Sequence, residues 1–153
     1  MLSDRTPQSS PKTEAPVESA TVLIVDHEYS TRKALRALLQ SIGVVHIGDA
    51  ADGPSGLDAV RSLVPDVVLL DWEMPDMDGA AFMRSVRAPN ASACPNVPII
   101  MLAGHGERSH VLEAVRLGVH EFLLKPVSGD ALLARIVSVL SKPHPCGTAV
   151  RRP

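Results

Sequence analysis

Short apolar runs alternate with longer helix-like segments through most of this chain, and this alternation constrains the fold more than any other feature. The apolar runs predict strands at residues 21–25, 44–48, 66–70, 97–102 and 120–124. Several of them are nearly continuous Val, Ile and Leu, as expected for parallel strands that are covered on both faces.

Apolar residues at helical spacing predict helices between and after these strands, at residues 30–41, 56–63, 80–87, 107–117 and 128–140. Ser128 is the expected N-cap of the last helix, and residues 80–87 have the weakest pattern. Five strand–helix alternations with short connections predict an α/β fold, with a five-stranded parallel sheet in the order 2-1-3-4-5 and helices on both faces.

The two ends of the chain differ from this body in composition. Residues 1–20 mix proline with polar residues and predict a disordered arm, and residues 142–153 predict a flexible tail, which leaves a domain of residues 21–141. The formal net charge of -2 provides no basic field for DNA or an anionic membrane, and no apolar run is long enough to span a bilayer. We therefore expect a cytoplasmic protein in which Cys94 and Cys146 stay reduced.

Charged residues stand directly after three of the predicted strands. Asp26 follows the first strand, Asp71 the third and Lys125 the fifth. Ligands of parallel sheets bind outside the carboxyl ends of the strands, so these side chains are expected to meet in one cleft. An Asp after a strand is often just a helix N-cap, which competes as an explanation for Asp26 alone. Together the three residues favour a site where carboxylates bind a hard cation and Lys125 pairs with an anion.

Longer motifs surround these residues. They are Val25-Asp26, the run Leu69-Leu70-Asp71-Trp72-Glu73-Met74-Pro75-Asp76-Met77-Asp78-Gly79, the strand 98–102 (PIIML), and Gly118 followed by Glu121-Phe122-Leu123-Leu124-Lys125-Pro126. In these motifs the body resembles the receiver domain of bacterial two-component response regulators, which has a flavodoxin-like fold, over nearly its whole length. Trp72 is expected to be a partly exposed neighbour of the site.

The resemblance implies a role in phosphorelay signalling for particular residues. Asp71 would accept a phosphoryl group from a sensor histidine kinase or a histidine phosphotransfer protein. Asp26, Asp71 and the main-chain carbonyl of Glu73 would hold Mg²⁺. Lys125 would pair with Asp71 or its phosphoryl oxygens and would be joined to the following proline by a cis bond. Phe122 would be the switch residue that changes rotamer on activation.

Two positions depart from the family pattern. His27 stands where the family has a second acidic residue that binds Mg²⁺ directly. Glu28, the next residue, is expected to start the following helix and not to take the place of that missing ligand. Imidazole is a poor ligand for Mg²⁺, so weakened affinity is expected, with Mn²⁺ as an alternative. Ala103 stands where the family has a Thr or Ser hydroxyl that bonds the phosphoryl group. Coupling between phosphorylation and Phe122 is therefore expected to be altered.

Three functions remain open from the sequence. A phospho-accepting response regulator that signals through protein–protein contacts is favoured, because Asp26, Asp71 and Lys125 are all present. The second is a pseudo-receiver that binds proteins independently of phosphate. The third, a phosphoester hydrolase acting through an aspartyl-phosphate, has the least support, because the chain has no cap domain and Glu73 belongs to the receiver motif. We therefore do not expect an enzyme.

His27 allows a narrower hypothesis because it lies between carboxylates. Its imidazolium form would stand in for a missing cation, and its neutral form would favour a softer metal such as Mn²⁺ or Zn²⁺. A tolerated substitution that merely weakens Mg²⁺ binding is the simpler interpretation.

The expected partner is the phosphodonor, and the resemblance also implies a surface for dimers or downstream proteins. In the family this surface is the face of the fourth helix, fifth strand and fifth helix. Here it would include His110, Glu113, Arg116, His120 and Arg135. An ordinary solvated surface explains any one of these residues equally well.

Overall fold

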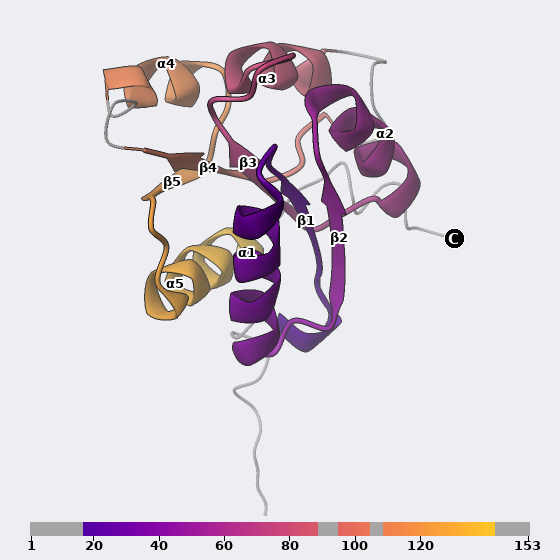
Figure 1. The fold of residues 1–153 in the computed structure, drawn as a ribbon, viewed down its shortest axis with the longest axis vertical. Coiled ribbons are helices and arrows are strands. Elements are labelled where there is room, and N and C mark those ends of the chain that lie inside the picture. The colour runs from indigo at the N-terminus through magenta and orange to yellow at the C-terminus, as the bar shows by residue number, and fades with distance from the viewer. Residues whose placement is uncertain (1–16, 89–94, 105–108, 143–153) are drawn as a thin grey trace, which may run out of the picture.

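One parallel sheet forms the centre of the molecule (Figure 1). The computed structural model describes residues 17–88, 95–104 and 109–142. The strands of the sheet are β1 (Thr21–Val25), β2 (His46–Ala50), β3 (Val67–Asp71), β4 (Ile99–Ala103) and β5 (Glu121–Leu124). They lie in the order β2-β1-β3-β4-β5, which confirms the predicted topology.

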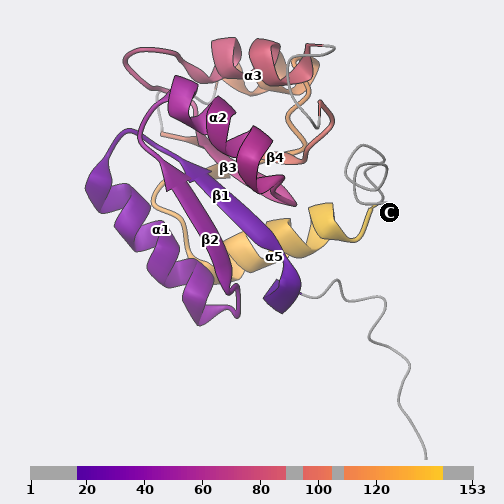
Figure 2. The ribbon, with the colours of Figure 1, turned by 90° about the vertical axis from the view of Figure 1, so that its right-hand side faces the viewer.

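Helices cover both faces of this sheet, as predicted. They are α1 (Tyr29–Ser41), α2 (Gly53–Leu63), α3 (Gly79–Arg87), α4 (Val111–Arg116) and α5 (Gly129–Leu140), and a short 3-10 helix, η2 (Val17–Ser19), precedes β1. Helices α1 and α5 lie on one face, and α2, α3 and α4 lie on the other (Figures 1 and 2). The molecule therefore has three layers.

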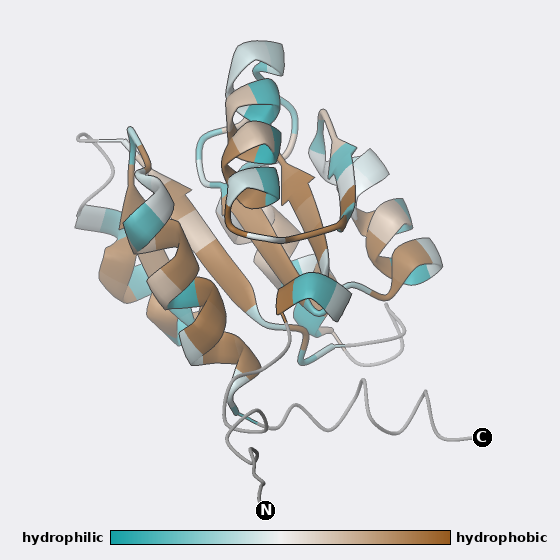
Figure 3. Ribbon diagram, turned by 90° about the horizontal axis from the view of Figure 1, so that it is seen from below, coloured by the Kyte–Doolittle hydropathy of each residue, from teal (hydrophilic) through white to brown (hydrophobic). Residues whose placement is uncertain are grey.

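Each face of the sheet has its own apolar core. Along β1, Val22 and Ile24 pack into the cluster under α1 and α5, whereas Leu23 and Val25 pack into the cluster on the α2 and α3 side. Successive residues of a strand point to opposite faces, so a strand that is covered twice must be apolar throughout. Figure 3 shows this directly, with hydrophobic strands enclosed by helices whose outer faces are more polar.

The second strand begins two residues later than predicted, at His46. Val44 is buried, which explains the apolar signal, but its N–H donates to the Leu39 carbonyl at 2.9 Å and so closes the end of α1. The turn between them needs Gly43, whose φ of 105° lies in the region that favours glycine. Val44 thus belongs to a helix-terminating turn, and the strand follows it.

Helix ends follow their capping residues. Helix α2 begins at Gly53, three residues before the predicted start, because the Asp52 side chain accepts from the Ser55 N–H. Ser128 caps α5 as predicted, accepting from the Ala131 N–H. Helix α4 is shorter than predicted over the described residues, and residues 105–108 lie outside them.

The predicted arm falls almost wholly outside the described part of the chain, as do the tail after Lys142 and both cysteines. These predictions therefore remain untested. Within the described residues, no helix has the length and apolar character needed to cross a membrane.

Candidate functional site

The carboxyl edge of the sheet brings two aspartates together. Asp71 is the last residue of β3, and Asp26 follows the neighbouring strand β1, whose Val25 pairs with Leu70. Asp26 is 0% exposed and Asp71 2% exposed, and they are the buried polar or charged residues within the described ranges. Two adjacent buried carboxylates are costly unless cations or donors compensate them, so their surroundings define the site.

Lys125 is the first of these compensating groups. Its Nζ lies 3.1 Å from Asp71 Oδ1 and 3.3 Å from Asp26 Oδ2. Since Lys125 follows β5, its side chain reaches across the end of β4 to meet them. Burial works to lower the pKa of Lys125, but the charges of Asp71 and Asp26 outweigh it and raise that pKa. The ammonium group therefore stays charged and neutralises part of the pair.

His27 is the second group that contacts the two carboxylates, and it does so from the side opposite Lys125. Its Nδ1 lies 2.8 Å from Asp71 Oδ2 and 4.0 Å from Asp26 Oδ1. Each aspartate thus directs one oxygen toward Lys125 and the other toward His27. The His27 side chain is 36% exposed, so it forms the solvent-facing wall of the site.

Main-chain and arginine donors complete the arrangement. The Glu28 N–H donates to Asp26 Oδ1 at 2.9 Å, and the Glu73 N–H approaches Asp71 Oδ1 at 3.4 Å. Arg32 Nη1 donates to the Asp26 carbonyl at 2.8 Å and holds the end of β1 from helix α1. Sequence reasoning missed Arg32, because an arginine in the first turns of a helix is ordinarily a surface residue.

The buried position of Asp26 raises the pKa of its carboxyl group. Burial raises its pKa, the Glu28 hydrogen bond works to lower it, and the charge of Asp71 raises it further, with a net increase despite Lys125. The folded protein therefore binds this proton more readily than the unfolded chain does. Ionisation of Asp26 accordingly destabilises the fold as pH rises from the unfolded pKa through the raised folded pKa.

Replacing Asp26 with Asn is therefore expected to raise the melting temperature at pH 7. A neutral amide removes the buried charge whose ionisation destabilises the fold, so we expect the free energy of unfolding to rise. The gain should shrink as pH falls toward the unfolded pKa, because wild-type Asp26 then becomes neutral as well. Calorimetric melting of both proteins from pH 7 to pH 4 tests this, and a lower melting temperature for the variant at pH 7 would contradict it.

Ala103 and Phe122, the expected coupling residues, lie on the neighbouring strands β4 and β5. Ala103 ends β4 and is fully buried, and its carbonyl accepts from the Lys125 N–H at 2.9 Å. Phe122 lies on the edge strand β5 and is 37% exposed. The bond between Lys125 and Pro126 is cis, as the resemblance implied. The switch role of Phe122 stays a prediction.

Trp72 is buried, at 5% exposed, so the expectation of a partly exposed ring was wrong. The reason is Gly79, where an added Cβ would lie 2.2 Å from the Trp72 ring. The Gly79 N–H also donates to the Trp72 carbonyl at 2.9 Å. The loop after β3 can therefore fold over the indole only because residue 79 has no side chain. Trp72 is the single tryptophan of the chain and directly follows Asp71 in the sequence.

The donor set determines which metal the site fits. Asp26, His27 and Asp71 each offer one ligand atom, and these atoms lie within 4.8 Å of one another. Mg²⁺ demands an octahedral shell of oxygen ligands and usually keeps several waters. Here an imidazole nitrogen occupies a ligand position, so the side chains do not fit Mg²⁺ well. A role for the Glu73 carbonyl stays a prediction.

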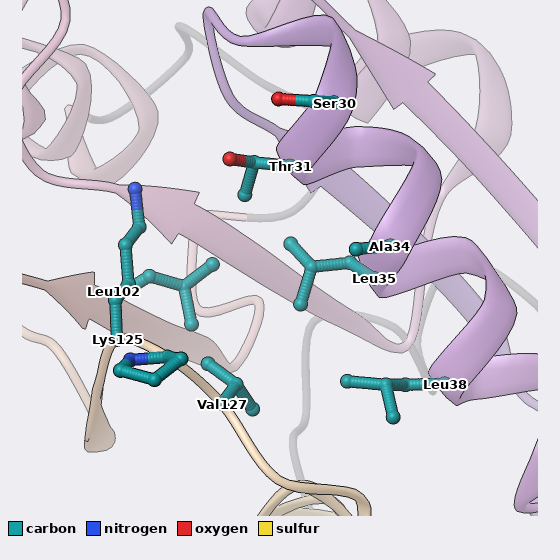
Figure 4. A pocket seen from close by; sticks show the side chains of 9 residues that line it. Ser30, Thr31, Ala34, Leu35, Leu38, Leu102, Lys125 and Val127 are labelled. Carbon is teal, nitrogen blue, oxygen red and sulfur yellow. The ribbon is translucent and has the colours of Figure 1, made fainter.

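A groove of about 400 Å³ opens beside the charged cluster (Figure 4). Ser30, Thr31, Leu35 and Leu38 line it from α1, and Lys125 reaches its upper end from the other wall. The groove is largely apolar, and its polar side-chain groups are the Ser30 and Thr31 hydroxyls and the Lys125 ammonium group.

Comparisons with known proteins agree with this geometry. The family model described as response regulator receiver domain matches residues 22–137. The chain is 29% identical over 121 residues to the chemotaxis protein CheY of Pseudomonas aeruginosa, covering 79% of this chain and 96% of that protein. It is 38% identical over 121 residues to the probable transcriptional regulator ycf27 of Guillardia theta, covering 79% of this chain but 45% of that one.

Solved structures show the same likeness. The Vibrio cholerae chemotaxis protein CheY4 superposes with a TM-score of 0.70 at 31% identity, covering 78% of this chain and 98% of that one. The chain thus spans nearly all of some relatives and less than half of the ycf27 relative.

Proposed function

The chain belongs to the response regulator receiver domain family of two-component signalling, and on this premise we propose that Asp71 accepts a phosphoryl group from a histidine kinase or a histidine phosphotransfer protein. The observation that carries the proposal is the Lys125 ammonium, which lies 3.1 Å from Asp71 and 3.3 Å from Asp26. Receiver domains bind Mg²⁺ through acidic residues, and here we expect Mg²⁺ to bind weakly and Mn²⁺ to be an alternative.

The two oxygens of Asp71 face different groups. Oδ1 contacts both Lys125 and the Glu73 N–H, whereas Oδ2 contacts His27. We assign Oδ1 as the nucleophile, because it lies beside the Lys125 ammonium that would neutralise the transferred group, and Oδ2 lies on the side of His27. The attack of Oδ1 on a phosphohistidine forms the new P–O bond as the P–N bond breaks, and the donor histidine leaves with the electron pair. Lys125 then neutralises charge on the transferred group.

We propose two surfaces of the domain as binding sites for partner proteins. The groove between α1 and Val127 adjoins Lys125, and we propose that the phosphodonor docks over it. On the α4–β5–α5 face, Leu112, Val115 and Phe122 are exposed by 69%, 55% and 37%. We propose this face for a homodimer or a downstream protein, so that the domain signals by contact rather than by catalysis. A cytoplasmic location stays part of this proposal.

Intact mass spectrometry tests the central claim. Wild type, Asp71→Asn and Asp76→Asn are incubated with a phosphorylated phosphotransfer protein or a small phosphodonor, first with Mg²⁺ and then with Mn²⁺. We expect one phosphoryl adduct on wild type and on the exposed control Asp76→Asn, and complete loss of the adduct in Asp71→Asn. An adduct that persists in Asp71→Asn would show that another residue accepts the group.

A phosphate-independent pseudo-receiver is the second candidate. The contact that favours it is the 2.8 Å hydrogen bond between His27 and Asp71 Oδ2, which occupies one oxygen of the proposed phosphoacceptor. This candidate predicts no adduct on wild type with any donor or metal, in contrast to a His27→Asp, Ala103→Thr double variant that does become phosphorylated.

A further inference from the structure

The ligand atoms at the carboxyl edge of the sheet form a mixed nitrogen–oxygen set. Asp26 Oδ1, Asp71 Oδ2 and His27 Nδ1 face one another on the side of the site away from Lys125. We infer that Asp26, His27 and Asp71 form a centre that selects a borderline transition metal of the Zn²⁺ class over Mg²⁺. The inference names the metal of the proposed phosphoacceptor site and in this sense rests on that proposed function.

The spacing of the three atoms suits a small tetrahedral shell. Zn²⁺ binds imidazole nitrogen and carboxylate oxygen at about 2.0–2.2 Å, which places tetrahedral ligands roughly 3.4 Å from one another. The His27 Nδ1 distances of 2.8 Å to Asp71 Oδ2 and 4.0 Å to Asp26 Oδ1 lie on either side of that value. The three ligand atoms all lie within 4.8 Å of one another, so binding requires side-chain shifts on the order of 1 Å, and a water molecule would complete the shell.

Lys125 does not compete for these ligand atoms. It bonds the opposite oxygen of each carboxylate, Asp26 Oδ2 and Asp71 Oδ1. The two carboxylates and one ammonium leave a local formal charge of about -1 when His27 is neutral, so a divalent cation is attracted to the remaining face. Metal binding through Nδ1 requires the neutral ring with its proton on Nε2, so the metal would replace the hydrogen bond between Nδ1 and Asp71 Oδ2.

Ligand type decides between the two cations. Imidazole suits Zn²⁺, Cu²⁺ and Ni²⁺, whereas Mg²⁺ is held by carboxylate, carbonyl and water oxygens. His27 therefore adds affinity for the first group and removes a ligand from the second. Because the other two ligands are common to both metals, the identity of residue 27 sets the preference.

Isothermal titration calorimetry with ZnCl₂ and MgCl₂ measures this preference without a phosphodonor. The full-length chain is used with Cys94→Ser and Cys146→Ser, because thiolates bind Zn²⁺ elsewhere. We expect one Zn²⁺ site, with an affinity at least about a hundredfold above that for Mg²⁺. In His27→Asp we expect Zn²⁺ affinity to fall at least about tenfold and Mg²⁺ affinity to rise by a similar factor.

His46→Asp is the matched control, because His46 is exposed at the opposite end of the sheet from the cluster. It should leave both affinities unchanged. The His27 ring resonances in a nitrogen-15 NMR spectrum give a second readout that needs no variant, since Nδ1 should shift on addition of one equivalent of Zn²⁺. Comparable affinities for the two metals, an unchanged preference in His27→Asp, or an unmoved His27 Nδ1 would each overturn the inference. None of these results depends on phosphorylation of Asp71, so the inference and the proposed function can fail separately.

Discussion

The double variant His27→Asp, Ala103→Thr is expected to accept a phosphoryl group on Asp71 about a hundredfold faster than wild type in the presence of Mg²⁺. The first substitution supplies a third carboxylate to the metal site and removes the ring that bonds Asp71 Oδ2. The second supplies a hydroxyl donor at the end of β4, where Ala103 has none. Rates are measured by stopped-flow quenching of Trp72 fluorescence with a small phosphodonor, and end points by intact mass.

The single variants show how much of the rate increase comes from the added carboxylate and how much from the added hydroxyl. His27→Asp alone should strengthen Mg²⁺ dependence, whereas Ala103→Thr alone should raise the rate at saturating metal. Ala103 is fully buried, so Ala103→Ser is the smaller replacement if threonine disturbs the strand. A double variant that folds normally and reacts no faster than wild type would show that these two positions do not limit phosphorylation.

Most of the fold could be predicted because each strand–helix unit carries its own local signal. Alternate residues of β1 pack into opposite cores, so the apolar run itself encodes burial on both faces. The site was predictable for a similar reason: in a parallel sheet the position of a residue after a strand fixes the edge where it lies. Asp26, Asp71 and Lys125 therefore converge without any long-range information.

Features that depend on contacts between distant segments were not predictable. The burial of Trp72 depends on the close approach of Gly79, and the alignment of His27 Nδ1 with Asp71 Oδ2 joins residues on different strands. Arg87 is a third case. In the sequence it is a basic residue at the end of the weakest predicted helix, and nothing in its neighbours distinguishes it from Arg84.

In the structure Arg87 joins two connections that are far apart in the chain. Its Nη1 donates to the Pro95 carbonyl at 2.7 Å and its Nη2 donates to the Gly118 carbonyl at 2.6 Å. Gly118 has a φ of 105°, and an added Cβ there would lie 2.7 Å from Arg87 Nε. Burial lowers the pKa of Arg87 to about 10, which still leaves the guanidinium charged at neutral pH. The residue thus ties the end of α3 to the segments before β4 and after α4.

Arg87→Met is accordingly expected to lower the free energy of unfolding by about 3 kcal/mol. Methionine keeps much of the apolar stem but leaves two carbonyl acceptors without their charged donor, at a cost of about 1–3 kcal/mol each where water cannot reach them. Arg84→Met is the control on the same helix, because Arg84 is 62% exposed and its 3.9 Å ion pair with Glu113 should contribute less than about 0.5 kcal/mol. Urea denaturation followed by circular dichroism measures both variants. Equal losses in the two would mean that Arg87 contributes no more than a surface charge, and that the packing around Gly118, rather than its hydrogen bond to Arg87, holds these segments together.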